Sequence, residues 1–215
     1  MNNEPIRIGT LGTGRMAGNL GRLWAGKGHR IFFGSRDPRR ANALAESAGP
    51  QARGGTYAEA VAFGAVILLA IPWTVVEETL RSLGSLDGKI LVDMTNPIRQ
   101  TEAGMELALN HTMSFAEAIA KQAPGAQVVK AFNTIYFAVL EKPAFGAEQA
   151  SSFFCGDDER AKAVVARLSR DLGFEPVDSG PLRNARLLEP LAVLWMQLAF
   201  SAGYGSDIAF KLLKR

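Results

Sequence analysis

The sequence predicts an α/β protein with a doubly wound, mostly parallel sheet, followed by a small C-terminal helical extension. Two observations lead to this prediction. Short apolar runs alternate with segments of helical periodicity, and a glycine-rich turn joins the first apolar run to the first helical segment. Such alternation is typical of βαβ units. A chain of 215 residues accommodates one such domain, which we place at residues 1–180, and a short extension, which we place at 181–215.

The predicted sheet contains seven strands, each a short apolar run bounded by turn residues. In chain order they are Ile6–Leu11, Arg30–Gly34, Ala65–Ile71, Ile90–Asp93, Gln127–Phe132, Ser152–Cys155 and Glu175–Asp178.

Four helix starts are marked by capping signals. Asp37 supplies a side-chain acceptor at the N-cap, and Pro38 presets φ at the first helical position. Three further pairs have the spacing of a capping box, in which two side chains satisfy the free amides reciprocally. These pairs are Thr56 with Glu59, Thr74 with Glu77, and Ser114 with Glu117.

Two later segments are also predicted as helices. Asp158–Leu172 has one apolar face, which should pack on the sheet. Asn184–Ala202 is apolar on almost every side, so that it must be buried on more than one side. We therefore expect a homodimer in which Trp195 and Leu198 lie near the contact between subunits.

Composition and charge narrow the class of protein. The net charge is only +3, and the one tight basic cluster, Arg36, Arg39 and Arg40, has no interleaved aromatic residues, so we expect no nucleic-acid partner. Cys155 is the only cysteine, which excludes an intramolecular disulfide and a multi-cysteine zinc site; we expect no metal and a cytoplasmic location. The most apolar stretches are too short to cross a bilayer, so we expect no membrane partner either.

The glycine-rich turn reads Gly12-Thr13-Gly14-Arg15-Met16-Ala17. A G-x-G-x-x-A sequence between a strand and a helix is the fingerprint of the Rossmann dinucleotide-binding fold. The first glycine permits the tight turn, and the second lets the backbone approach the pyrophosphate, which faces the helix N-terminus. The sequence therefore predicts that residues 12–16 bind the pyrophosphate of a dinucleotide.

The end of the second strand indicates which dinucleotide binds. An NAD site would place an acidic residue there to accept hydrogen bonds from the ribose hydroxyls. This chain has Gly34-Ser35-Arg36 instead, and an arginine and a hydroxyl at this point are suited to a 2′-phosphate. We therefore predict that the chain binds NADP(H) through Ser35 and Arg36.

Three other strand ends should line the same crevice, because ligands bind at the carboxyl ends of strands in an open α/β sheet. They carry Ala70-Ile71-Pro72, Asn96 and Asn133-Thr134, which we expect beside the nicotinamide. An alternative interpretation is that Asn96 and Asn133 are turn residues without a ligand.

The sequence shows no acid–base constellation, and we assign no catalytic residue. His29 begins a strand at the end opposite the crevice, and His111 lies in a loop or helix. Hydride transfer between two bound carriers depends on their alignment more than on a side-chain acid. A flavin-like acceptor is therefore favoured over a hydroxyacid or alcohol, whose oxygen needs a proton donor.

A set of segments along the chain matches one known family. The segments are the phosphate loop at 12–17, Ser35-Arg36, Ile71-Pro72-Trp73, Lys130-Ala131-Phe132-Asn133-Thr134, Cys155-Gly156-Asp157-Asp158 and residues 178–189. Through them nearly the whole chain resembles the NADPH-dependent reductases of the deazaflavin coenzyme F420, a family fold that also serves as the cytosolic NADPH domain of some membrane metalloreductases. The resemblance implies a homodimer, NADP along the strand ends and the deazaflavin near the nicotinamide. The archaeal members differ in the first loop and have His in place of Asn133.

Several interpretations stay open from the sequence. The leading one is an oxidoreductase that moves hydride between NADP(H) and F420 or a flavin-type acceptor such as FMN or FAD. The alternatives are a ferric or flavin reductase, a small imine or β-hydroxyacid reductase, and an NADPH-binding sensor without enzymatic activity. Fewer than 40 residues follow residue 180, which is too few for the helical domain that an imine or hydroxyacid reductase needs.

Overall fold

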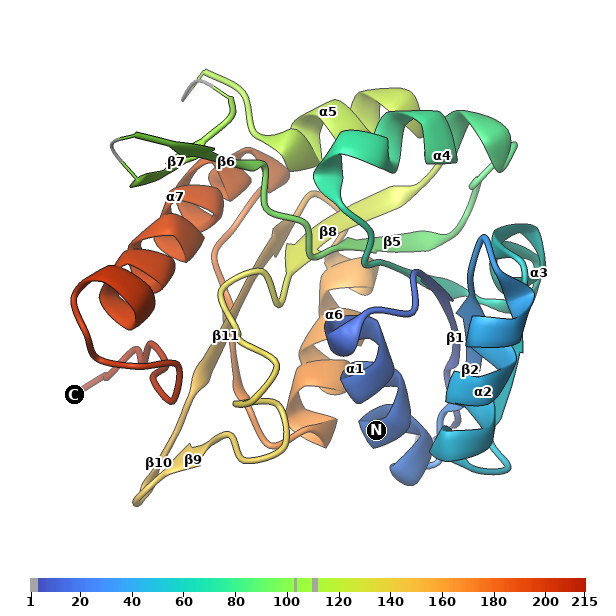
Figure 1. Cartoon of the computed structure of the whole chain (residues 1–215), viewed down its shortest axis with the longest axis horizontal. Coiled ribbons are helices and arrows are strands. Elements are labelled where there is room, and N and C mark those ends of the chain that lie inside the picture. Colours follow the sequence, from blue (N-terminus) through green and yellow to red (C-terminus); the bar gives the residue numbers. More distant parts are fainter. Residues whose placement is uncertain (1–3, 103, 110–111) are drawn as a thin grey trace.

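An eight-stranded sheet with helices on both faces forms the centre of the molecule (Figure 1). The computed structural model describes residues 4–102, 104–109 and 112–215, and His111 lies outside this part of the chain. Across the sheet the strand order is β12-β11-β8-β5-β4-β1-β2-β3. Six neighbouring strands of this sheet, β8-β5-β4-β1-β2-β3, are all parallel. They follow the Rossmann order, in which the strand order reverses beside β1. The predicted fold is confirmed.

All seven predicted strands are present. They are β1 (Arg7–Leu11), β2 (Arg30–Gly34), β4 (Val66–Leu69), β5 (Ile90–Asp93), β8 (Gln127–Ala131), β11 (Ser151–Gly156) and β12 (Glu175–Asp178). β11 runs antiparallel to β8, and β12 runs parallel to β11. The sheet thus extends by two strands beyond the six-stranded parallel core.

Five strands were not predicted. β3 (Ala52–Gly55) has the sequence Ala-Arg-Gly-Gly, which lacks the β-branched and aromatic residues typical of strands. Its place is fixed by tertiary contact, because a side chain at Gly54 would collide with the backbone of α2 at Ala41. The other four form two small antiparallel pairs, β6 (Ile98–Thr101) with β7 (Gly104–Leu107) and β9 (Ala144–Phe145) with β10 (Glu148–Gln149).

The helices divide between the two faces of the sheet, because alternate strand residues point to opposite faces. Val66 and Leu68 belong to one apolar core, and Ile67 and Leu69 belong to the other. The first core is covered by α1 (Arg15–Gly26), α2 (Pro38–Ala48) and α6 (Glu159–Asp171). The second is covered by α3 (Tyr57–Phe63), α4 (Val76–Ser82), α5 (Phe115–Gln122) and α7 (Ala185–Met196).

Three of the four predicted helix starts are confirmed. Asp37 caps α2 through the amide of Arg39, and both Thr56 and Ser114 form complete capping boxes. The fourth prediction is wrong, because Trp73–Val75 forms a 3-10 turn and α4 begins only at Val76, without a side-chain cap. Glu77 pairs with Arg81 on the helix surface instead of returning to Thr74.

The last helix ends in a π turn at Gln197–Ser201, and the chain then crosses the start of β11, where Phe210 accepts a hydrogen bond from the amide of Ser151. Trp195 is buried within its own chain: it stacks on Tyr136, and its Nε1 donates to the carbonyl of Ile208 at 2.9 Å. Trp195 is therefore not free for the subunit contact predicted for it. The exposed side of α7 carries Leu187 and Leu194, which are 68% and 49% exposed.

Candidate dinucleotide-binding site

The turn between β1 and α1 is built for close approach of a ligand to the backbone. Gly12 has φ +118°, and any side chain there would collide with the carbonyl of Ala70 on the neighbouring β4 loop. Gly14 is the N-cap of α1, and a Cβ placed on it meets nothing within 4 Å. Gly12 is therefore required by the fold, whereas Gly14 borders open space in front of the helix N-terminus.

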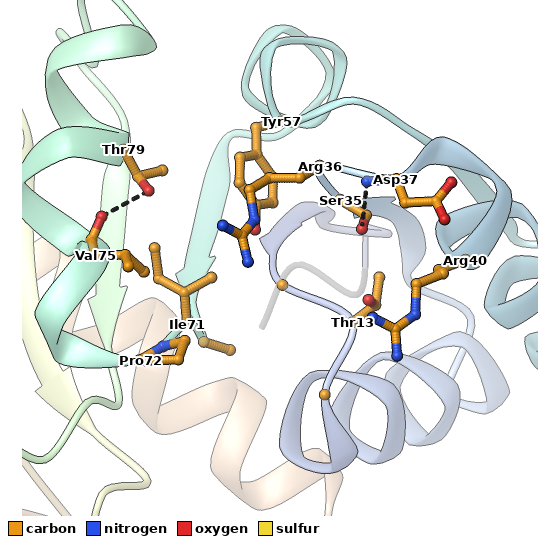
Figure 2. Close-up of a pocket in the computed structure, with 13 residues that line it drawn as sticks. Thr13, Ser35, Arg36, Asp37, Arg40, Tyr57, Ile71, Pro72, Val75 and Thr79 are labelled. Carbon is orange, nitrogen blue, oxygen red and sulfur yellow. Dashed lines mark hydrogen bonds between the residues drawn. The ribbon is translucent and has the colours of Figure 1, made fainter.

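A pocket of about 390 Å³ occupies that space. Figure 2 shows two walls, one formed by the loops after β1 and β2 and the other by the segment that follows β4. The pocket brings together eight of the twelve predicted site residues, namely Gly12, Thr13, Gly14, Ser35, Arg36, Ala70, Ile71 and Pro72. Its other lining residues are Asp37, Arg40, Tyr57, Val75 and Thr79.

The loop after β2 supplies positive charge and a hydroxyl group. Ser35 is buried, and its Oγ accepts a hydrogen bond from the amide of Asp37 at 3.1 Å, so the hydroxyl hydrogen is free to be donated elsewhere. Arg36 is exposed, and Arg40 extends from α2 toward Thr13 (Figure 2). Arg40 belongs to the basic cluster that the sequence shows, for which a local phosphate is the expected partner, but it was not among the predicted cofactor-binding residues.

The carboxylate of Asp37, which lines the pocket, is engaged through one of its oxygens by its own helix. Its Oδ1 accepts from the amide and the Nε of Arg39, at 3.1 and 3.2 Å. The side-chain hydrogen bond from Arg39 holds the pKa of Asp37 below its usual value. The acid therefore stays ionised as the N-cap of α2, and it is already engaged by its own helix.

Tyr57, Val75 and Thr79 complete the pocket beside Arg36, and none of them was predicted. The ring of Tyr57, from the first turn of α3, lies against the side chain of Arg36 (Figure 2). Burial raises the pKa of the Tyr57 phenol, although the charge of Arg36 opposes the shift. Thr79 donates to the carbonyl of Val75 at 2.8 Å. Tyr57 contacts a segment that is distant from it in the sequence. No local motif could therefore predict its place in the pocket.

Arg15 and Met16 were predicted to meet the pyrophosphate, and neither lines the pocket. The guanidinium of Arg15 lies over the ring of Phe137, 5.1 Å from its centroid, and Met16 packs against the apolar core. Their roles as ligand contacts stay predictions.

Asn96 and Asn133 lie outside the pocket and bind each other at the ends of β5 and β8. Asn133 Nδ2 donates to Asn96 Oδ1 at 3.1 Å and to the carbonyl of Leu188 at 2.8 Å, and Asn96 Nδ2 donates to the carbonyl of Asn133 at 2.8 Å. Within the described residues, Asn133 Oδ1 is the one buried side-chain nitrogen or oxygen that lacks a partner. Buried polar atoms are normally hydrogen-bonded, so this oxygen marks a place for an external donor.

The backbone before Asn133 is strained. Phe132 has φ +60°, a left-handed conformation that bulky residues rarely adopt. Its ring is fully buried and packs edge-on against Trp24, with the centroids 5.7 Å apart. This packing holds the turn that presents Asn133, and such strain is concentrated at functional sites.

A buried ionic cluster that sequence reasoning missed lies directly below this turn. Lys130 Nζ contacts Asp93 Oδ2 at 2.8 Å and Glu189 Oε1 at 3.1 Å, and all three side chains are almost completely buried. No spacing in the sequence relates these residues, because they come from β8, β5 and α7.

Two further titratable groups of the described residues, His29 and Cys155, are buried and lie outside the pocket. His29 is buried, accepts from the amide of Ile6 at 3.1 Å and lies 3.0 Å from Asp171. Burial raises the pKa of the Cys155 thiol to about 12. Among residues 4–102, 104–109 and 112–215, no cluster of metal-binding side chains is found. No helix in the same part of the chain is long and apolar enough to cross a membrane.

These features fit a dinucleotide. The open space at Gly14 admits a pyrophosphate, and the cations and the hydroxyl after β2 suit a phosphate on the adenosine ribose. Asn133 Oδ1, which lies outside the pocket, is a buried acceptor without a partner among the described residues. Fold and site together define a Rossmann dinucleotide-binding protein.

Comparison with known proteins identifies the family. Residues 7–97 match the model of the family described as "NADP oxidoreductase coenzyme F420-dependent". A solved structure from Arthrobacter sp. FB24, provisionally named an F420-dependent NADP reductase, is 30% identical, with a TM-score of 0.87 and coverage of 97% of this chain and 100% of that one. The chain therefore belongs to the F420-dependent NADP oxidoreductase family.

Two curated relatives represent different members of this group. The F420-dependent NADP reductase of Methanocaldococcus jannaschii is 29% identical over 90% of this chain and 92% of its own length. Metalloreductase STEAP3 of Rattus norvegicus is 36% identical over 89% of this chain, but the chain spans only 38% of that protein.

Proposed function

We propose that this protein binds NADPH and transfers a hydride between NADP(H) and the deazaflavin F420. The observation that carries the proposal is the continuous pocket from the Gly12-Thr13-Gly14 turn to Ser35, Arg36 and Arg40. The one carboxylate that lines this pocket, Asp37, accepts hydrogen bonds from Arg39 through its Oδ1.

At the phosphate end, each part of the chain has a separate task. The first turn of α1 and the loop at Gly14 receive the pyrophosphate, because free amides and the helix dipole favour an anion there. Arg36 and Arg40 provide two cations for the 2′-phosphate, and Ser35 donates its hydroxyl hydrogen. NADH lacks this phosphate and leaves both arginines without their ligand. The site therefore selects NADPH by charge.

At the nicotinamide end, the chain positions the ring. Ile71 and Pro72 give an apolar wall, and Asn133 Oδ1 accepts from the carboxamide of the nicotinamide, which satisfies the one buried oxygen without a partner among the described residues. NADPH supplies the hydride when it is bound. Arg15, Met16 and Asn96 do not line this pocket, and we propose that they contact parts of the ligand that lie outside it.

The proposed acceptor follows from the relatives and from the chemistry of the crevice. The reductase of M. jannaschii is named for F420 and matches this chain over nearly its whole length. No histidine, lysine or cysteine lines the pocket, and its one phenol, that of Tyr57, lies against Arg36 at the phosphate end (Figure 2). A deazaflavin needs alignment with the nicotinamide more than a side-chain acid.

A second function has its own support. The similarity to metalloreductase STEAP3 favours reduction of a metal acceptor, such as a ferric chelate, by the bound NADPH. A non-enzymatic NADPH sensor is the third outcome that the test must separate.

The test is steady-state oxidation of NADPH with F420, FMN, FAD and ferric chelates as acceptors. The proposal expects turnover with F420 well above that with the others. Faster turnover with a ferric chelate would establish the second function, faster turnover with FMN or FAD would replace F420 by a flavin as the acceptor, and tight NADPH binding without turnover would establish the sensor. Gly14→Val serves as an inactive control, because its branched side chain fills the pyrophosphate space.

We further propose that the protein is a homodimer that forms through the exposed side of α7. Leu187, Leu194 and Phe200 are 68%, 49% and 54% exposed, and bulky apolar groups of this kind are enriched in subunit contacts. Light scattering should give twice the chain mass of 23.1 kDa for the wild type and a monomer or aggregate for Leu194→Glu. A wild-type monomer at micromolar concentration would contradict the dimer.

A further inference from the structure

The buried cluster of Asp93, Lys130 and Glu189 has no task in the proposed function so far. The three side chains are 0%, 0% and 3% exposed. With one cation and two carboxylates, the cluster has a net charge of −1. Buried ion pairs seldom add stability over apolar residues of similar volume, so a cluster of this kind calls for another explanation.

Every donor of Lys130 is used. Its ammonium group binds Asp93 Oδ2 at 2.8 Å, the carbonyl of Thr95 at 2.6 Å and Glu189 Oε1 at 3.1 Å. Burial alone would lower the pKa of Lys130, but the two carboxylates outweigh it and the pKa lies above its usual value. Lys130 is therefore a fixed cation that joins β5, β8 and α7.

Glu189 extends this connection to a second helix. Its Oε2 accepts from the amide of Phe115 at 3.0 Å, and its Oε1 accepts from the amide of Ala116 at 3.2 Å. These are the first two residues of α5, whose amides have no partner within the helix. One carboxylate on α7 thus fixes the start of α5 and the end of β8 together.

The residue next to Glu189 acts on the nicotinamide end. The carbonyl of Leu188 receives Asn133 Nδ2, whose other hydrogen goes to Asn96 Oδ1. An amide nitrogen has two hydrogens, and both are donated here. A flip of the Asn133 amide group would lose both hydrogen bonds. Its oxygen is left as the free acceptor because α7 holds the nitrogen.

We propose that Lys130 and Glu189 are positioning residues, which hold α7 on β8 so that the Leu188 carbonyl orients the Asn133 amide with its oxygen free for the nicotinamide carboxamide. The inference rests on the proposed function, in which Asn133 meets the nicotinamide. Two contacts join this part of the chain to α7, Lys130 with Glu189 and Asn133 with the carbonyl of Leu188. Lys130 and Asn133 are three residues apart in the sequence, and Leu188 and Glu189 are adjacent.

The test compares two ligands that share the phosphate end. NADP⁺ carries a nicotinamide, whereas adenosine 2′,5′-bisphosphate carries the adenosine and the 2′-phosphate alone. The variants are Glu189→Gln, which removes a charge at nearly constant volume, and Lys130→Met/Glu189→Gln, which keeps the net charge of the cluster at −1. Lys162→Met is the matched control, because Lys162 is also a buried lysine held by two carboxylates, Asp178 and Glu159, at the far side of the sheet.

In calorimetric titrations, both cluster variants should bind NADP⁺ at least tenfold more weakly than the wild type and bind the bisphosphate within twofold of it. In turnover with F420, kcat should fall at saturating NADPH. The Lys162→Met control should leave the affinities for NADP⁺ and for the bisphosphate, and kcat, unchanged. Equal losses for both ligands, or no loss for NADP⁺, would overturn the positioning role.

A measurement on the wild type needs no variant. NADP⁺ should slow hydrogen exchange at the amides of Phe115 and Ala116, which Glu189 holds, and the bisphosphate should leave them unchanged. Equal protection by both ligands would contradict the inference. A wild type that binds neither ligand would instead refute the proposed function.

Discussion

The two ends of the proposed cofactor crevice, the phosphate end and the nicotinamide end, are constructed in opposite ways. The phosphate end consists of short loops after β1 and β2, with an exposed Arg36 and open space at Gly14. The nicotinamide end consists of a buried hydrogen-bonded network in which Asn133 and Lys130 are tied to α7. One end offers charge to a ligand that arrives from solvent, and the other offers a prearranged acceptor. The comparison teaches that affinity and alignment are supplied by different parts of the chain.

The largest effect is expected from blocking the phosphate end at its backbone. Gly14→Val should lower NADPH affinity by about 3 kcal/mol or more, because the loss of hydrogen bonds to a charged group costs about 1.5–3 kcal/mol each. Gly14 is exposed and its Cβ position is empty, so the fold should survive. Isothermal titration calorimetry checks the affinity, and circular dichroism checks the fold.

Gly26→Val is the matched control for that variant. Gly26 ends the same helix, and a Cβ on it also meets nothing within 4 Å. NADPH binding should be unchanged in this control. Normal NADPH affinity in a folded Gly14→Val protein would remove the pyrophosphate from this loop.

A second variant reverses a positive charge at the phosphate end. Arg36→Asp should lower NADPH affinity by about 2–3 kcal/mol, the range for lost charge-assisted hydrogen bonds, and affect NADH less. Arg53→Asp makes the same change of charge on the neighbouring strand β3, but Arg53 is exposed and does not line the pocket. Titration of both variants with both cofactors checks this prediction, and equal losses in the two variants would show that only general charge matters.

The contrast between the two ends also explains what the sequence could predict. The phosphate end lies on two short runs of the chain. Its residues Gly12, Gly14, Ser35 and Arg36 could therefore be predicted from motif and spacing alone. Tyr57 was missed because it reaches the pocket from α3, and Arg40 was recognised as part of a basic cluster but not as a cofactor-binding residue. The fold could be predicted for a related reason, since strand and helix signals are local.

The nicotinamide end could be predicted only in part. Asn96 and Asn133 follow strands, so their position at the crevice edge was expected, but their mutual hydrogen bonds were not. Glu189 lies almost sixty residues after Lys130 and acts through a tertiary contact that no local pattern encodes. Strand β3 was missed for the same reason, and Thr74 failed as a cap because the chain after β4 continues in a 3-10 turn.

A smaller effect concerns the contact between α5 and α7 that supports the nicotinamide end. Hydrogen bonds from Arg186 lower the pKa of Glu117 to about 2. The pair therefore stabilises the fold above pH 4.5, the ordinary value, and this contribution is lost as the pH falls toward 2. We expect about 1–2 kcal/mol, which is reduced because Arg186 is partly exposed to solvent.

Urea unfolding at pH 7 and at pH 3 measures this contribution. Glu117→Gln should be less stable than the wild type at pH 7, and the difference should shrink at pH 3. A difference that is the same at both pH values would show that the ion pair does not supply it.

The smallest effect is expected at Cys155, which lies in the same apolar core as Leu188. With a pKa of about 12, the thiol stays protonated at pH 8 and its sulfur is fully buried. A thiol reagent should label native protein negligibly and urea-unfolded protein at the ordinary rate. Rapid labelling of the native protein would show that the core around α7 opens readily.

The central claim is that the crevice selects NADP(H) through the phosphate end. It is tested most directly by calorimetric titration of the wild-type protein with NADPH and with NADH under the same salt conditions. The account predicts that NADPH binds more tightly by about 2–3 kcal/mol, the contribution of charge-assisted hydrogen bonds to the 2′-phosphate. Equal affinities for the two cofactors would contradict it.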